Sequence, residues 1–494
     1  MSLKLIRLAA ALLALSSGVL AQEGGATGPS TLNPSYKCDP TTCVMPKCYC
    51  ASSNPPGGLT PAKIPQFITL TFDDAVNSVV EPVIYNLTNY HVNPNGCPLA
   101  ATFFVSTQWT DYWRVQKLYG NGHEIACHTM NHIGNPPVEE IQGSQIALNH
   151  YGGVPKNSLL GFRHPFLLYS TQSYQNLASL GTFLYDSSMV VEANTPIWPY
   201  TLDFGPAIGC VTGSCTGNFS FPGLWSIPMP NLNNPDDTIN TSMDPLATAT
   251  APLTSDGILA MLKFNFLKHY NGQRTPMGLF LHATPALPTI EPQRLTAYMQ
   301  FISWTQSTYP DVYWVTNQQL LAWMRNPTDT QGSLTNPALG CTIAARDPSN
   351  AEVCDGVDNK GDGNIDIGLT ESCSYMDQNA YFSSCFGCPS KAPNVSDPNP
   401  STTSTRHFIP DAGCPNAGTW DPVAGQCVNL KRKVAVAGEA PFNPPPGIQI
   451  PGISNQSSTS PSQGSKSAAA SRFDFSLALA LVPAAAFALL TRHA

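Results

Sequence analysis

The chain has 494 residues, more than one hydrophobic core usually serves, so we expect one main domain with smaller appendages. Only 11% of the residues are charged and the formal net charge is -8, which excludes a basic surface for a nucleic-acid backbone. No nucleic acid is therefore expected among the partners of this chain.

The first residues have the pattern of a secretory signal peptide. Residues 1–21 combine the basic Lys4 and Arg7 with an apolar run at 8–15 and small residues up to Ala21. The apolar run is shorter than the roughly 20 residues of a helix that spans a membrane. We predict that 1–21 is cleaved and that the chain is secreted; a membrane anchor is the alternative.

Cysteines crowd both flanks of the main domain. We expect a cross-linked lead-in at 22–61 and a cysteine-rich module at 340–430. The total is 15, and an exported chain forms disulfides because its compartment is oxidising. Since this number is odd, we nominate Cys127, inside the closely built segment 123–132, as the unpaired and buried cysteine.

Apolar runs of β type alternate with helical periodicity across residues 62–330. Apolar residues recur at helical spacing in 254–270, and the β-type runs lie at 67–72, 101–105, 159–162, 183–185, 277–282 and 312–315. This alternation predicts an α/β fold with a parallel sheet. We expect a distorted (β/α) barrel with its site at the carboxyl ends of the strands; an open doubly wound sheet is the alternative.

The C-terminal end has the composition of a stalk followed by an anchor signal. Residues 431–471 are rich in Pro, Gly and Ser, which predicts a flexible stalk. Within 472–494, an uncharged apolar tail follows a small-residue segment, the pattern of a glycosylphosphatidylinositol (GPI) anchor signal. We predict attachment to the outer membrane leaflet at the cell surface; a single spanning helix is the alternative.

Two pairs of polar residues have the character of metal ligands. Asp73 and Asp74 directly follow an apolar run, and two adjacent carboxylates need a cation or hydrogen-bond donors when buried. His128 and His132 are four residues apart, a spacing that places both imidazoles on one side of a helical turn. Each pair alone is more often a solvated turn or helix surface. Together they predict a site for a divalent transition metal.

Further apolar runs end in polar residues, and their order along the chain is informative. Three such segments are Gly161-Phe-Arg-His-Pro-Phe166, Phe183-Leu-Tyr-Asp186 and Gly278-Leu-Phe-Leu-His-Ala283. The motifs of the chain resemble, in type and order, those of the polysaccharide deacetylases, carbohydrate esterase family 4: Thr71-Phe-Asp-Asp74, His128-Thr-x-x-His132, Arg163-x-Pro-Phe166 and Leu281-His282. The likeness extends over about residues 38–327 and is greatest to the chitin deacetylases of animals.

This resemblance implies a hydrolase that removes N-acetyl groups from chitin or related N-acetylglucosamine polymers and releases acetate. It implies that Asp74, His128 and His132 hold the ion, typically zinc. Asp73 would be the general base, and Arg163 would keep Asp73 ionised and oriented.

The resemblance also assigns the remaining steps of amide hydrolysis. The backbone N–H of Phe166 would stabilise the oxyanion, and His282 would protonate the departing amine. We expect Asp186 to orient His282, with Asp203 as the substitute.

The sequence leaves two other functions open. The chain is, in one alternative, a non-catalytic chitin-binding or cell-wall-organising protein. In the other, it deacetylates a different N-acetylated glycan.

The cysteine-rich module contains a run of Asp, Asn and Gly of the kind that wraps calcium with oxygen ligands. A polar turn tied by disulfides is the alternative. The candidate Ca²⁺ ligands are Asp355, Asp358, Asp362 and Asp366.

Overall fold

The computed structural model describes residues 33–89, 91–245, 254–341, 370–384 and 387–401, and the backbone of 419–421 and 426–428. The predicted signal peptide, stalk and anchor signal lie outside the described residues. So do the candidate calcium ligands Asp355, Asp358, Asp362 and Asp366. Within the described ranges, no helix is both long enough and apolar enough to cross a membrane.

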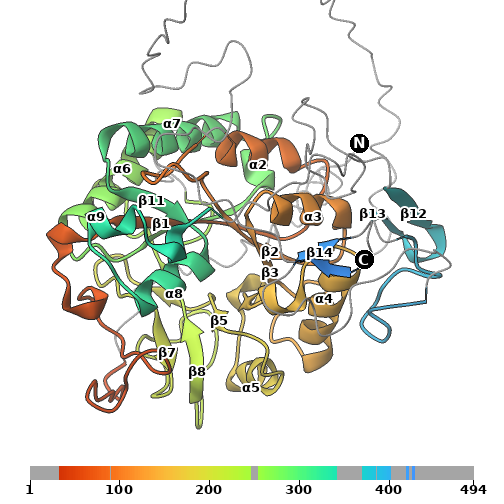
Figure 1. Cartoon of the computed structure of the whole chain (residues 1–494), viewed down its shortest axis with the longest axis horizontal. Coiled ribbons are helices and arrows are strands. Elements are labelled where there is room, and N and C mark those ends of the chain that lie inside the picture. Colours follow the sequence, from red (N-terminus) through yellow and green to blue (C-terminus); the bar gives the residue numbers. More distant parts are fainter. Residues whose placement is uncertain are drawn as a thin grey trace, which may run out of the picture. The chain divides into compact units, whose positions relative to one another are not determined.

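The main domain is built on a nine-stranded sheet (Figure 1). The central strand β1 (Gln66–Asp73) is buried along its whole length, as expected for a parallel strand covered on both faces. The sheet runs in the order β10-β1-β2-β3-β4-β5-β8-β7, and β11 also pairs with β1. The other strands are β2 (Thr102–Val105), β3 (Glu124–Cys127), β4 (Gly161–Phe162), β5 (Tyr185–Asp186), β7 (Tyr200–Leu202), β8 (Phe221–Ser226), β10 (Met277–His282) and β11 (Val312–Val315).

All pairings in this sheet are parallel except that of β7 with β8. The helices are α2 (Glu81–Thr88), α3 (Tyr112–Gly120), α4 (Val138–His150), α5 (Thr171–Ser179), α6 (Ser255–Asn271), α7 (Pro292–Thr308), α8 (Asn317–Arg325) and α9 (Thr330–Ser333). The curled sheet with its surrounding helices is the distorted (β/α) barrel predicted from the sequence (Figure 1). The alternative of an open doubly wound sheet is therefore dropped.

Local sequence signals account for several helix starts. The side chain of Ser170 accepts a hydrogen bond from Ser173 N, and Thr316 and Gln319 form a capping box at the start of α8. At the start of α6, the side chain of Thr254 accepts a hydrogen bond from Gly257 N. Each cap satisfies a backbone N–H that the first helical turn leaves without a partner.

Small elements complete the chain. The paired strands outside the main sheet are β6 (Val190–Val191) with β9 (Met229–Pro230), β12 (Glu371–Tyr375) with β13 (Ala380–Ser384), and β14 (Thr419–Asp421) with β15 (Gln426–Val428). Short 3-10 helices are η1 (Pro56–Gly58), η2 (Pro61–Lys63), η3 (Lys156–Ser158), η4 (Pro165–Leu167), η5 (Thr284–Ala286), η6 (Pro337–Leu339) and η7 (Met376–Gln378).

Disulfides fasten the flanks of the domain. The described ones are Cys38–Cys50, Cys43–Cys48, Cys97–Cys341, Cys210–Cys215 and Cys373–Cys388. Cys127 is buried and free, as predicted, and burial raises the pKa of its thiol to about 12. A thiol with such a pKa is unreactive near neutral pH.

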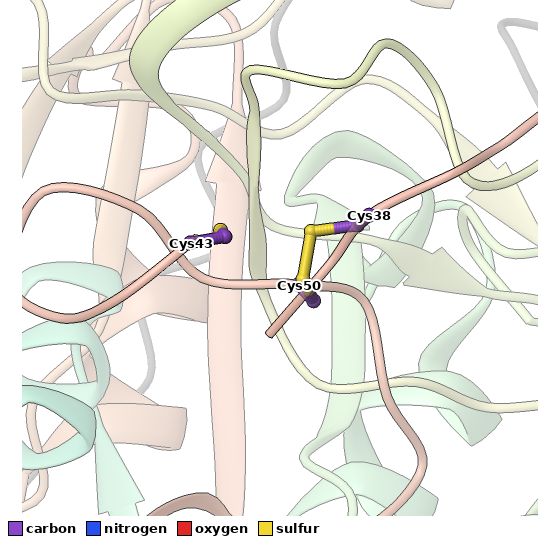
Figure 2. A group of neighbouring side chains, drawn as sticks. All are labelled: Cys38, Cys43 and Cys50. Atoms are coloured by element: carbon purple, nitrogen blue, oxygen red, sulfur yellow. A yellow bond between two sulfur atoms is a disulfide. The ribbon is translucent and has the colours of Figure 1, made fainter. Parts of the chain in front are cut away.

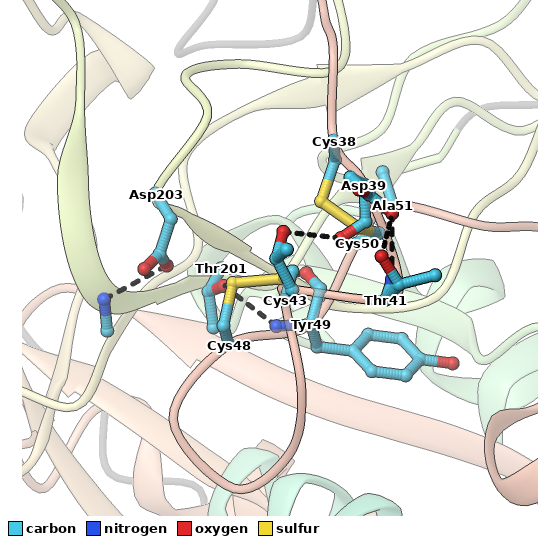
Figure 3. Close-up of a disulfide and its surroundings, with 12 residues drawn as sticks. Cys38, Asp39, Thr41, Cys43, Cys48, Tyr49, Cys50, Ala51, Thr201 and Asp203 are labelled. Carbon is cyan, nitrogen blue, oxygen red and sulfur yellow. Dashed lines mark hydrogen bonds between the residues drawn. A yellow bond between two sulfur atoms is a disulfide. The ribbon is translucent and has the colours of Figure 1, made fainter.

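The lead-in segment lies along strand β7. Tyr49 N donates to Thr201 Oγ1 at 2.9 Å, and Thr201 N donates to Tyr49 O at 3.0 Å. Figure 3 shows these residues beside the Cys43–Cys48 disulfide. The disulfides Cys38–Cys50 and Cys43–Cys48 thus hold the lead-in in a fixed shape on the edge of the sheet.

The β12–β13 hairpin, from the cysteine-rich segment, packs on the barrel near α3 and α4 (Figure 1). The ring of Phe382 lies 5.0 Å from that of Tyr112 and 5.9 Å from that of Tyr151, centroid to centroid. Ser383 N donates to Asp111 Oδ1 at 2.6 Å. This part of the cysteine-rich segment therefore shares a hydrophobic core with the main domain.

Candidate metal and catalytic site

The carboxyl ends of several parallel strands bring the predicted site residues together. Asp73 on β1 and His282 on β10 are direct partners in the strand register. His128 follows β3, and Arg163 follows β4. Polar side chains at the carboxyl ends of neighbouring parallel strands meet at one edge, which is where (β/α) barrels place their sites.

Three of these side chains form a compact set of nitrogen and oxygen atoms. Candidate ligand atoms of Asp74, His128 and His132 all lie within 4.8 Å of one another. Asp74 Oδ1 is 3.2 Å from His132 Nε2 and 3.8 Å from His128 Nε2. Two imidazoles and one carboxylate fit a divalent transition metal in donor type and number.

The surroundings of His128 favour a neutral ring with its ligand nitrogen directed at Asp74. Its Nδ1 donates to the carbonyl of Arg163 at 2.8 Å, which leaves the lone pair on Nε2. Burial, and secondarily the neighbouring His132, holds the pKa of His128 well below its usual value. A neutral imidazole is the form that binds a metal.

The prediction that a helical turn brings His128 and His132 together is wrong. Residues 128–137 form a loop between β3 and α4. Thr129 and His132 have left-handed backbone angles, with φ of 66° and 53°. The carboxylate of Glu140 holds the loop by accepting from Met130 N and Asn131 N, each at 3.0 Å. Spacing alone did not reveal this, because the conformation depends on Glu140 from the following helix.

The guanidinium of Arg163 binds the predicted base. Arg163 is fully buried, and its Nη1 donates to Asp73 Oδ1 at 2.5 Å and to Thr71 Oγ1 at 2.9 Å. Its other nitrogens donate to Ser187, at 2.6 Å to the carbonyl and 3.1 Å to the hydroxyl. Arg163 is therefore a fixed, charged donor that orients one carboxylate oxygen of Asp73.

His282 has a carboxylate partner, but it is not the predicted one. Asp244 Oδ2 accepts from His282 Nδ1 at 2.6 Å, and Asp244 Oδ1 accepts from His282 N at 2.8 Å. The expected partner Asp186 and its substitute Asp203 lie elsewhere, so that prediction is corrected. Asp203 accepts from the backbone N–H of Gly223 at 3.1 Å (Figure 3).

Asp186 belongs to a different histidine. Its Oδ2 contacts His164 Nδ1 at 3.0 Å, and its Oδ1 accepts from the hydroxyl of Tyr174 at 2.5 Å. The hydroxyl and backbone N–H of Ser188 also donate to it, at 2.8 and 3.0 Å. Asp186 is fully buried. It therefore anchors the end of β5 instead of reaching His282.

Phe166 lies at the rim of the site in a left-handed conformation, with φ of 59°. Its ring is 4.4 Å from that of His132, centroid to centroid. Such a conformation is unfavourable for a bulky residue and persists where the surrounding structure imposes it. The turn thus holds the backbone of Phe166 beside the metal-ligand candidates.

A second group of clustered cysteines does not form a metal site. The sulfur atoms of Cys38, Cys43 and Cys50 lie close together (Figure 2). Each of them is bound in a disulfide, Cys38 to Cys50 and Cys43 to Cys48. A metal binds a thiolate, so these sulfurs are not ligands.

Sequence reasoning missed Asp244 because its signal is weak. It precedes Pro245 in a segment without periodicity, and it reaches His282 across 38 residues of sequence. An Asp-Pro pair by itself indicates only a turn. The structure brings it to β10 through a bridge between Met243 and Phe280.

The segment that carries most of the candidate site matches a known protein family. The polysaccharide deacetylase family model matches residues 61–184. That segment includes Asp73, Asp74, His128, His132 and Arg163. Together with the relatives below, this match shows that the chain belongs to the polysaccharide deacetylase family.

Two curated relatives come from Bombyx mori. Chitin deacetylase 8 is 31% identical over 303 residues, 59% of this chain and 78% of that protein. Chitin deacetylase 1 is 32% identical over 313 residues, 59% of this chain and 57% of that protein. The chain thus spans little more than half the length of chitin deacetylase 1.

Among solved structures, a family 4 acetyl xylan esterase from Clostridium thermocellum is 18% identical, covering 54% of this chain and 95% of that one. Its TM-score of 0.32 is too low for a conclusion.

Proposed function

We propose that this protein is a metal-dependent hydrolase that removes N-acetyl groups from chitin or a related N-acetylglucosamine polymer and releases acetate. The observation that carries the proposal is the arrangement of Asp74, His128 and His132 beside the Asp73–Arg163 pair and His282. Its relatives that are named chitin deacetylases support the substrate class.

Asp74, His128 and His132 would hold the ion, zinc or another divalent transition metal. When bound there, such an ion would supply a Lewis acid that lowers the pKa of water and polarises the acetamide carbonyl.

Asp73 takes the proton from the attacking water in this proposal. Its side chain is 3% exposed. The buried guanidinium of Arg163 donates to one oxygen of this carboxylate and fixes its orientation. Arg163 therefore acts as a positioning residue for the base.

His282 supplies the proton that the departing amine requires. Asp244 accepts from Nδ1, so the other ring nitrogen carries the transferable proton when the ring is charged. His282 Nε2 lies 3.8 Å from Asp74 Oδ2, on the side of the metal-ligand candidates. The proposed acid therefore lies beside the residues that would hold the ion.

The oxyanion of the tetrahedral intermediate needs a donor that is in place before the reaction begins. Phe166 offers its backbone N–H from a turn whose conformation the fold imposes. The ring of Phe166 beside His132 also excludes water from one side of the site.

The same proposal places the protein outside the cell. The described disulfides are stable in an oxidising compartment, which supports secretion. Attachment to the outer membrane leaflet by a GPI anchor remains a prediction from the C-terminal sequence.

The test is acetate release from six-sugar N-acetylglucosamine oligomers by the full chain in the presence of zinc. Asp73→Asn removes the base and is expected to abolish release. Asp203→Asn is the matched control, because that carboxylate lies near Gly223 and not at the site. Oligomer binding without acetate release by the unaltered chain would instead support a non-catalytic chitin-binding protein.

Release only from a different N-acetylated glycan would keep the reaction and change the substrate. Hydrolysis that survives Asp73→Asn would overturn the mechanism.

A further inference from the structure

The carboxylate of Asp244 reaches His282 from an unusual backbone conformation. The φ angle of Asp244 is 46°, in the left-handed region. The next residue is Pro245, and a proline ring favours an extended conformation with negative φ for the residue before it. Asp244 is therefore strained for two independent reasons, and such a conformation persists only where the surrounding structure imposes it.

Strand β10 supplies part of that support. Asp244 N donates to Phe280 O at 2.9 Å, and the two carboxylate oxygens of Asp244 accept from the backbone and the ring of His282. These contacts use the N–H and the side chain of Asp244. They leave its carbonyl to another element of the fold.

Arg294 of α7 binds that carbonyl. Its Nη1 donates to Asp244 O at 3.0 Å and to Pro245 O at 3.3 Å. The carboxylate of Glu291 pairs with its Nε, and the hydroxyl of Tyr298 lies 3.5 Å from its Nη1. Arg294 is 4% exposed. The guanidinium is thus a buried, fixed donor to two consecutive carbonyls.

The place of Arg294 in α7 is not one that helix stability favours. The helix begins at Pro292, so Arg294 lies in its first turn. The positive end of the helix dipole lies there, and a cation in this turn is unfavourable. The contacts of Arg294 outside the helix, with the carbonyls of Asp244 and Pro245, therefore account for a buried arginine at this position better than the helix does.

We propose that Arg294 is a positioning residue for the acid of the reaction, because it holds the backbone from which the Asp244 carboxylate reaches Nδ1 of His282. The inference rests on the proposed function and adds a third member to the His282–Asp244 pair. Without the guanidinium, the strained backbone relaxes towards negative φ and the carboxylate moves away from the ring. Arg294 itself touches neither the metal-ligand candidates nor the ring of His282 in its printed contacts with Asp244, Pro245, Glu291 and Tyr298.

The test is a double-mutant cycle on acetate release from the six-sugar oligomer, with Arg294→Met, Asp244→Asn and the variant that carries both. Arg294→Met is expected to lower kcat roughly 10-fold and to change KM less than about 2-fold, because the residue acts on the proton donor and not on substrate binding. In the Asp244→Asn background, Arg294→Met is expected to cost less than about 2-fold in kcat, since the carboxylate that it positions is already absent.

Arg274→Met is the matched control. Arg274 is 7% exposed, is paired with Asp311 at 3.0 Å and precedes the amino end of β10, whereas His282 ends that strand. Loss of a buried ion pair lowers the stability of both variants, but only Arg294→Met should lower kcat. If Arg294→Met does not fold, Arg294→Lys passes through the same cycle, with a smaller loss because the charge stays and the planar donor is lost.

An unchanged kcat in the Arg294 variant would overturn the positioning role while deacetylation stands. Equal losses of kcat with and without Asp244→Asn, an equal loss in Arg274→Met, or a loss confined to KM would overturn it as well. Absence of acetate release by the unaltered chain would overturn the proposed function, and the positioning role with it.

Discussion

Two histidine–aspartate pairs lie at the carboxyl ends of the same sheet and differ in what surrounds them. In one, His282 Nδ1 is 2.6 Å from Asp244, and the histidine side chain is 11% exposed. In the other, His164 Nδ1 is 3.0 Å from Asp186, and both side chains are fully buried. Only the first pair faces Asp74, at 3.8 Å from its Oδ2. A histidine–aspartate pair can therefore transfer a proton where a substrate can reach it, as at His282. Where the pair is fully buried, as at His164, it can only stabilise the fold.

Removal of His282 has the largest expected effect. His282→Ala leaves the departing amine without its acid, so kcat on the six-sugar oligomer should fall roughly 10²- to 10⁴-fold. His91→Ala is the control, since His91 contacts Gln306 away from the site. Equal rates for the two variants would show that His282 is not the acid.

Removal of the buried carboxylate tests the other side of the comparison. Asp186→Ala leaves His164, the hydroxyl of Tyr174 and Ser188 without their partner. The free energy of unfolding should fall by about 3–5 kcal/mol, measured by urea denaturation with the disulfides intact. Asp244→Ala, at the less deeply buried pair, should cost less than half as much. A reversed order would contradict the distinction between the pairs.

Asp244→Asn sharpens the comparison at the His282–Asp244 pair. The amide keeps the shape but no longer stabilises a charged His282, so kcat should fall roughly 10- to 100-fold while KM changes little. A loss confined to KM would assign Asp244 to substrate binding instead.

His123 extends the comparison to an imidazole that accepts a backbone hydrogen bond, from Ala101 N at 3.2 Å. Burial lowers its pKa from 6.5 to about 4. The unfolded chain therefore binds more protons between these values, and stability falls as the pH is lowered through this window. His123→Asn should reduce the loss of unfolding free energy between pH 7 and pH 5 by about 2 kcal/mol.

Urea denaturation at the two pH values measures this difference. An unchanged pH dependence in His123→Asn would show that His123 is not responsible for it.

Sequence patterns predicted the parts of the fold that local chemistry controls. The apolar runs at 277–282 and 312–315 coincide with strands β10 and β11, because continuous apolar stretches are what a covered parallel strand requires. The run at 183–185 lies slightly too early, since β5 ends with the buried Asp186. Strand β3 was missed because its four residues begin with a charged Glu124 that is buried among partners from distant segments.

The site was predictable as far as its motifs reach. Ligand candidates next to strand ends met as expected because the sheet is parallel. Asp244 was not predictable, since it belongs to no motif and its contact with His282 depends on the path of the chain between α5 and β10. The loop at His132 was misjudged for the same reason, because a carboxylate of α4 holds it.

Zinc titration into chelator-treated full chain, followed by calorimetry, tests the central claim most directly. The account predicts one ion bound per chain, return of acetate release at the same stoichiometry, and loss of this binding in His128→Ala. Undiminished acetate release from the metal-depleted chain, or equal zinc binding by His128→Ala, would contradict the assignment of Asp74, His128 and His132 as the metal site.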